Sequence, residues 1–134
     1  MIKKFLLFIL LVIVNIMVFC SEIEQAVKLI NEGKYDEAIK LLESNGEQND
    51  ILLSIAYLGK RDFQTAKIFA LQYWLQNENN VLANFILGFI SEELKDYQSA
   101  LLYWNSVYKN AKDSSLRRLA KRHIDVLKRI SEGK

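Results

Sequence analysis

One short sequence motif, which we call the repeated phrase, occurs three times along the chain and constrains most strongly how this sequence folds. Each copy holds a turn, an aromatic residue, two polar residues and an alanine. The copies are Gly33-Lys-Tyr35-Asp-Glu-Ala38, Arg61-Asp-Phe63-Gln-Thr-Ala66 and Lys95-Asp-Tyr97-Gln-Ser-Ala100. The interval between the second and third copies is about 34 residues, and the interval between the first two is shorter. A recurrence at this period indicates a repeat protein, in which each copy is one supersecondary unit.

Apolar residues at helical spacing precede each copy of the phrase. Before the third copy they are Leu82, Phe85, Ile86, Phe89 and Ile90. This spacing predicts an amphipathic helix that ends at the turn, and the aromatic residue then opens a second helix. The whole chain has five glycines and no proline, too few turn residues for a sandwich or barrel of short strands. We therefore expect an all-α fold built from helix-turn-helix units.

The period of about 34 residues and the residue pattern of the three copies resemble the tetratricopeptide repeat. The third unit keeps the pattern best, with Leu87-Gly88 on its first helix, Asp96-Tyr97 at the turn, and Ala100 and Trp104 on its second helix. The resemblance implies a short helical solenoid with repeats at 21–46, 47–80 and 81–112. The small and large residues that would pack the repeats together are Tyr35, Ala38, Phe63, Ala66, Gly88, Tyr97, Ala100 and Trp104.

In this family the first helix of each repeat lines a concave groove that binds a protein partner. The matching positions here are apolar, so the resemblance implies a groove for an apolar or amphipathic segment of another protein, or for a second copy of the chain. Burial of some of these side chains between neighbouring helices is the alternative. The lining residues are Ile23, Val27, Ile51, Leu52, Ile55, Leu82, Phe85, Ile86 and Phe89.

The first nineteen residues are expected to be a signal peptide or membrane anchor. Two lysines precede an apolar run from Phe5 to Phe19, which is about 22 Å long as a helix and short for a membrane span of ~30 Å. Cys20, the only cysteine, follows directly. The layout resembles a bacterial lipoprotein signal, which implies lipid attachment at Cys20. An uncleaved anchor and a soluble secreted product are the alternatives. All three place the remaining chain outside the cytoplasmic membrane, with the periplasmic side of the cell envelope expected.

The segment 113–134 is expected to be a capping helix with a basic outer face. Asp113-Ser114-Ser115 is a helix start, and apolar residues follow at spacings of three and four. Residues 112–134 hold eight Lys or Arg against three Asp or Glu, a net charge of +5, whereas residues 20–111 carry −5. This face is either simply solvated or docks on an acidic partner or anionic headgroups; nucleic acid fits an exported protein poorly. The basic face comprises Arg117, Arg118, Lys121, Arg122, Lys128 and Arg129.

No constellation in the sequence indicates catalysis, a metal or another cofactor. One cysteine and one histidine cannot supply a zinc site. His123 has no partner implied by its spacing and is expected to be an ordinary boundary histidine, while Glu92-Glu93 is expected to be a solvated helix end. The sequence therefore predicts a non-enzymatic, membrane-tethered scaffold that holds a protein partner. By architecture it is similar to accessory subunits of envelope assembly machines. A self-associating structural adaptor of the cell envelope is the alternative.

Overall fold

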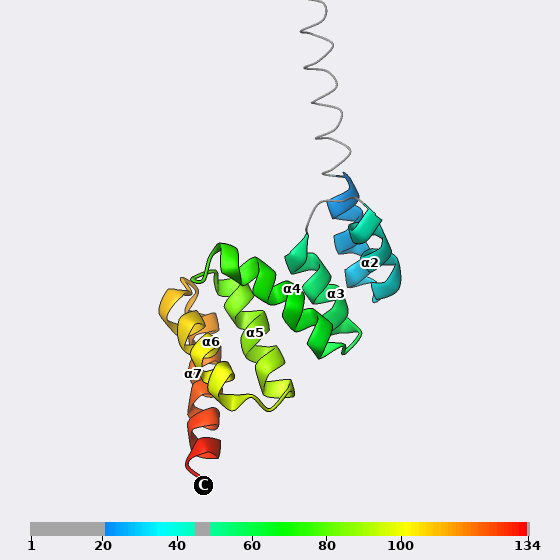
Figure 1. Cartoon of the computed structure of the whole chain (residues 1–134). Helices are drawn as coiled ribbons and strands as arrows, with labels where there is room; N and C mark the ends of the chain where they lie inside the picture. Colours follow the sequence, from blue (N-terminus) through cyan, green and yellow to red (C-terminus); the bar gives the residue numbers. More distant parts are fainter. Residues whose placement is uncertain (1–20, 45–48, 134) are drawn as a thin grey trace, which may run out of the picture.

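In the computed structural model, the described parts of the chain, residues 21–44 and 49–133, are helical throughout, without strands. Within these ranges a helical segment at 21–31 is followed by six further helices (Figure 1). These are α2 (Tyr35–Ser44), α3 (Asp50–Gly59), α4 (Phe63–Gln76), α5 (Val81–Glu93), α6 (Tyr97–Asn110) and α7 (Ser114–Ser131). From α2 onwards each helix packs on the next one along the chain, and α3 also touches α5. The expected all-α class is confirmed.

The three copies of the repeated phrase form the same backbone turn. Gly33, Arg61 and Lys95 adopt positive φ values of 75°, 63° and 60°. At each site the amide of this residue donates to the carbonyl three residues back, and the next amide donates to the carbonyl five residues before it. These paired bonds define a Schellman motif, which ends a helix by satisfying its last carbonyls. The repeated phrase therefore marks the C-terminal end of a helix.

Four of the helices begin at a polar cap. The side chains of Asp62, Asn80, Asp96 and Asp113 each accept a hydrogen bond from the amide three residues later, at 2.8–3.2 Å. Such bonds satisfy an amide that would otherwise lack a partner at the helix start. Hydrogen bonding from Thr65 lowers the pKa of Asp62, and hydrogen bonding from Ser99 lowers that of Asp96.

Small residues let the paired helices approach closely. A Cβ atom added at Gly88 would lie 2.9 Å from the Trp104 ring, and one added at Gly59 would collide with the Tyr35 ring. The expected packing residues are all either buried or half-buried. Ala38, Ala66 and Ala100 are fully buried, and Trp104 is 1% exposed. The helices are therefore held by interlocking small and large side chains.

Helix α7 covers the end of the molecule opposite residue 21 (Figure 1). Its buried residues Ala120, Ile124 and Leu127 join a core cluster with Trp104 and Val107 of α6. The expected signal or anchor at 1–19, Cys20 and the end of the first repeat at 45–46 lie outside the described residues. Among the helices of residues 21–44 and 49–133, none has both the length and the hydrophobicity needed to cross a membrane.

Candidate partner-binding groove

The predicted groove residues fall into two rows that follow the spacing of the repeated phrase. Ile23, Ile51 and Phe85 occupy one position of the three repeats, and Val27, Ile55 and Phe89 occupy another. We call the first set the inner row and the second set the outer row. The core-facing side of each helix follows the same register: Leu53 and Leu87 are both buried, as are Ala56 and Ile90. Equivalent residues therefore face equivalent directions on α3 and α5.

The same spacing continues into α7. One further repeat period of about 34 residues leads from Phe85 to Leu119 and from Phe89 to His123. Two buried positions follow this register, because Ala120 and Ile124 are buried like their counterparts Ile86 and Ile90, whereas Lys121 and Arg122, the counterparts of the buried Leu87 and Gly88, are exposed. Helix α7 thus extends both rows by one position. The sequence pattern predicted α7 only as a cap, although the repeat period, continued once more, would have found Leu119 and His123.

The rows differ in how far they are open to solvent. Val27 and Phe89 are 38% and 37% exposed, and Leu82 on α5 is 47% exposed. The inner row is half-buried: Ile51 packs against the core, and the Phe85 ring lies edge-on to Trp104 with centroids 5.3 Å apart. Outer-row Ile55 also packs partly against the core.

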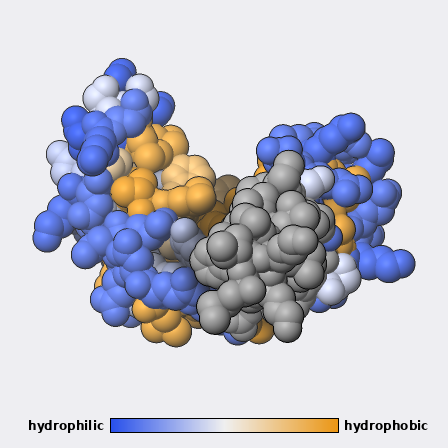
Figure 2. Space-filling model, turned by 90° about the horizontal axis from the view of Figure 1, so that it is seen from above, coloured by the Kyte–Doolittle hydropathy of each residue, from blue (hydrophilic) through white to orange (hydrophobic). Residues whose placement is uncertain are grey.

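Two expected lining residues contribute more to the core than to the groove. Ile86 is 3% exposed, and Leu52 packs against the core cluster of α2 and α3. Figure 2 shows apolar surface gathered on the inner side of the molecule, between more hydrophilic flanks. Of the nine expected lining residues, Val27, Leu82 and Phe89 are therefore the ones whose side chains are exposed.

A polar cluster from three helices closes the α7 end of the rows. Nδ1 of His123 lies 2.7 Å from Oε1 of Glu92, and Nε1 of Trp104 donates to the same oxygen at 2.5 Å. The imidazole also stacks on the Trp104 ring, with centroids 4.2 Å apart and planes 15° from parallel. We refer to these residues as the Glu92–Trp104–His123 cluster. It joins the end of α5 to α6 and α7.

This cluster corrects two expectations. Glu92 is not a solvated helix end, because its carboxylate binds Trp104 and His123 and is only 26% exposed. His123 does have a carboxylate partner, 31 residues away in the sequence. No local spacing predicts this pair, because α5 and α7 each pack on α6 and the two side chains meet only in that arrangement. Only Glu93, which is exposed, fits the expected solvated end.

The cluster borders a shallow hollow of about 320 Å³ beside the outer row. Its lining consists of Glu92, Leu119, Arg122, His123 and Val126. Among these side chains there is no hydroxyl or thiol that His123 could activate as a nucleophile. The hollow instead offers apolar surface with a cation at its rim, a combination that suits an amphipathic polypeptide.

The expected basic face divides into two parts. Arg117 turns inward and donates to the carbonyls of Ala111 and Lys112 at 2.8 and 2.9 Å, which satisfies the end of α6. Lys121 pairs with Asp125 at 2.6 Å, and this hydrogen bond raises the pKa of Lys121 and lowers that of Asp125. The four remaining cations are exposed and form no ion pair with a described residue. They are Arg118, Arg122, Lys128 and Arg129.

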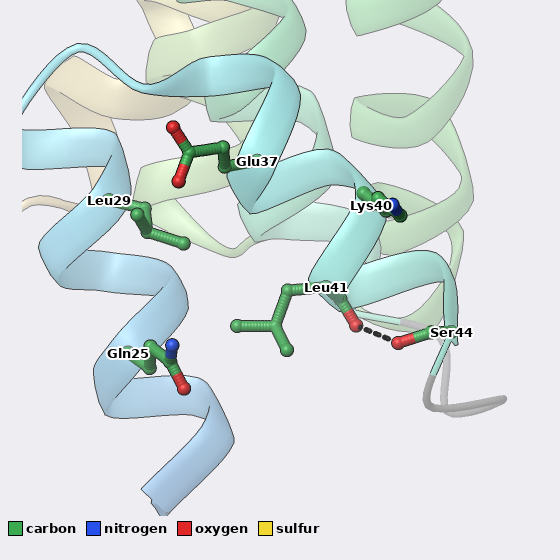
Figure 3. Close-up of a pocket in the computed structure, with 6 residues that line it drawn as sticks. All are labelled: Gln25, Leu29, Glu37, Lys40, Leu41 and Ser44. Carbon is green, nitrogen blue, oxygen red and sulfur yellow. Dashed lines mark hydrogen bonds between the residues drawn. The ribbon is translucent and has the colours of Figure 1, made fainter.

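A second hollow of about 330 Å³ lies between the segment 21–31 and α2 (Figure 3). The side chains of Leu29 and Leu41 point into it, with Glu37 near one end and Gln25 near the other (Figure 3). Lys40 and Ser44 complete its lining, and the Ser44 hydroxyl donates to the Leu41 carbonyl at 2.9 Å. This hollow lies at the opposite end of the molecule from α7.

Within the described ranges, no group of three or more His, Cys, Asp or Glu side chains could hold a metal ion. Comparison with protein-family models and with curated proteins found no match to this chain.

Proposed function

We propose that this chain is a non-enzymatic, membrane-tethered scaffold of tetratricopeptide-like repeats that binds a protein partner at the extracytoplasmic membrane surface. Its helix pairs act as a short solenoid, α7 caps them, and the two apolar rows form the binding groove. A role as an accessory subunit of an envelope assembly complex fits this architecture. The partner contributes an apolar or amphipathic segment that lies across the rows.

The observation that carries this proposal is the recurrence of the apolar rows on the first helices of successive repeats. Core packing explains the inner row, which is half-buried. It does not explain why Val27 and Phe89, at equivalent positions of different repeats, both remain more than a third exposed. Exposed apolar side chains gathered on one concave face are typical of a protein-binding site.

The tether would consist of residues 1–19 and Cys20, either as a lipidated cysteine or as an uncleaved helix. The described structure is already helical at residue 21, immediately after Cys20. A groove attached in this way stays close to the bilayer, which favours capture of partners at the membrane. Replacing Cys20 by Ser should abolish fatty-acid labelling and move the protein out of the detergent phase. Unchanged partitioning without any labelling would instead support the uncleaved anchor.

The groove can be tested with a photo-crosslinking amino acid placed at Phe89 in intact cells. The expected result is a defined crosslinked product that is lost when Val27 and Leu82 are both changed to Asp. The same crosslinker at Leu102 is the matched control, because Leu102 is 59% exposed and lies on a second helix. Products at Leu102 alone would place the binding surface on the second helices and refute the groove.

Self-association through the groove is the alternative function, since the same rows could bind a second copy. The mass of the crosslinked product separates the two functions. A product of twice the chain mass, formed with the purified protein alone, would favour the structural adaptor.

A further inference from the structure

The two ends of the molecule carry opposite charge. Helix α7 (Ser114–Ser131) has six Lys or Arg against one Asp, a net charge of +5. Residues 21–44 at the other end have six Asp or Glu against three Lys, a net charge of −3. Surfaces of opposite sign on one molecule attract when copies meet, because complementary potentials steer association and fix its orientation.

The basic end presents its charge on a single face. At 100° per residue, Arg118, Arg122 and Arg129 lie within about 40° of one another on α7, opposite the buried Ala120, Ile124 and Leu127. No described helix packs on this outer face. Arg118 and Arg122 are exposed and form no ion pair with a described residue, so they are available to an acidic surface, whereas Arg129 donates to the carbonyl of Asp125.

The acidic end offers both a carboxylate and an apolar surface against which the methylene groups of an arginine can pack. Of its six acids, Glu32 pairs with Lys34 and Asp36 pairs with Lys60, but Glu22 and Glu37 form no ion pair with a described residue. Glu37 lines the 330 Å³ hollow whose inner wall includes Leu29 and Leu41 (Figure 3). An arginine can lay its methylene groups along such leucines while its guanidinium binds the carboxylate.

We propose that α7 of one copy docks on the end hollow between residues 21–31 and α2 of a second copy. Arg118 and Arg122 would meet Glu22 and Glu37, with the arginine stems against Leu29 and Leu41. The side chains on one face of a helix can pack into the groove between two other helices. Because the contact joins unlike surfaces, a pair of copies keeps one free basic end and one free acidic end. The association is therefore head-to-tail and continues into a row or closes into a ring.

This contact uses neither apolar row, although Arg122 also lines the hollow beside the outer row. It depends on exposed charges, so salt weakens it: the screening length falls from about 10 Å at 0.1 M to about 3 Å at 1 M. The expected behaviour of the purified full-length chain is a mass that grows beyond a dimer with concentration at low salt. Raising the salt to about 0.5 M should return it towards the unassociated form.

Charge reversal provides the decisive experiment. One variant carries Arg118→Glu with Arg122→Glu, which removes the basic docking face; the other carries Glu22→Lys with Glu37→Lys, which removes the acidic one. Each variant alone should lose at least tenfold in association, measured by sedimentation velocity. An equimolar mixture should regain association between unlike copies, which two different affinity tags detect. Glu93→Lys, an exposed reversal on α5, is the matched control and should behave like the parent.

Circular dichroism establishes that each variant keeps its helices, which is expected because the changed side chains lie at or near the surface. A parent chain with the same mass at every concentration and salt would overturn the proposal. So would association that survives both reversals, or reversed variants that fail to restore each other in the mixture. Association that is lost in Phe89→Asp and kept in both reversed variants would also overturn it and would instead assign self-association to the groove.

Discussion

Lys95 holds a backbone conformation that glycine adopts at lower cost. Its φ of 60° lies in the left-handed region, where a side chain crowds the following carbonyl and costs about 1–2 kcal/mol. Arg61, at the equivalent turn of the preceding repeat, does the same, whereas the first repeat places Gly33 at this position. The chain thus carries an avoidable strain at two of its three equivalent turns.

Replacing Lys95 by Gly should raise the free energy of unfolding by roughly 0.5–1 kcal/mol, because relief of strain exceeds the extra entropy of glycine in the unfolded chain. Urea denaturation followed by circular dichroism measures the change. Gly33→Ala is the reverse control and should lose a similar amount, since a Cβ there would touch nothing and only its conformation matters. If Lys95→Gly lowered stability, the left-handed turn would not be a source of strain.

Asp50 and Asn84 occupy equivalent positions of the second and third repeats, but only Asn84 is satisfied. The Asn84 amide donates to the carbonyls of Glu78 and Asn80 at 2.8 Å, and its oxygen accepts from Trp74. Asp50 is 2% exposed, and its Oδ1 atom has no hydrogen-bond partner among the described residues. Burial raises the pKa of Asp50 above its ordinary value. Ionisation is therefore harder in the folded chain than in the unfolded one.

Asp50→Asn should stabilise the protein by about 1 kcal/mol at neutral pH, since it removes a buried carboxylate with an unsatisfied oxygen. The folded pKa is raised, so the parent loses stability as the pH rises past the ordinary value of about 4. The advantage of the variant should consequently shrink as the pH falls below that value. Melting temperatures of both proteins across this range give the measurement. The reverse change, Asn84→Asp, should be destabilising at neutral pH; a gap for Asp50→Asn that is constant with pH would contradict the role of ionisation.

At the scale of helices, the Glu92–Trp104–His123 cluster secures α7 against α5 and α6. Trp104 is almost fully buried, so its indole N–H depends on the Glu92 carboxylate for a hydrogen bond. Removing an acceptor from a buried donor costs about 1–3 kcal/mol. Glu92→Ala should lose stability in this range and speed amide exchange in α7, as measured by urea denaturation and by hydrogen exchange.

The adjacent Glu93 offers a close control for this prediction. It lies on the same helix, and its side chain is exposed. Glu93→Ala should change the free energy of unfolding by no more than about 0.5 kcal/mol. Equal losses in the two variants would mean that the cluster does not hold α7.

The helices and turns were predictable because the same local chemistry recurs along the chain. The phrases around Tyr35, Phe63 and Tyr97 each combine a helix stop with a helix start, and neither signal depends on distant residues. The groove was predictable only in part. Periodicity assigns a residue to one face of a helix, but the burial of Ile86 depends on how closely α4 and α6 pack against α5. The pairing of Glu92 with His123 depends on tertiary packing alone.

At the scale of the whole molecule, the first repeat is the least anchored part of the described chain. Helix α2 buries three residues, Ala38, Ile39 and Leu42, whereas α5 buries seven along its length. Helix α5 also packs between α4 and α6, while residues 21–31 lie at an end. In a linear array of repeats, each unit is stabilised mainly by its neighbours, so an end unit opens first.

Hydrogen exchange should therefore be fastest in residues 21–44 and slowest in α5 and α6, as read by mass spectrometry of peptides at neutral pH. Low urea should open the first repeat before the rest loses its helices. Ala100→Leu, which overpacks the core cluster that α6 shares with α7 and with Phe85 of α5 at a cost of about 1–3 kcal/mol, should speed exchange there. Uniform exchange across all repeats would show that the chain unfolds as one cooperative unit.

Because the repeat spacing of the two rows continues from α5 into α7, this architecture does not by itself fix the number of repeats. A duplicate of the third repeat inserted ahead of α7 would present its copy of α6 to α7, as in the present chain. A longer version could therefore be made by copying a segment, with the contact between α6 and the copied α5 as its one new interface.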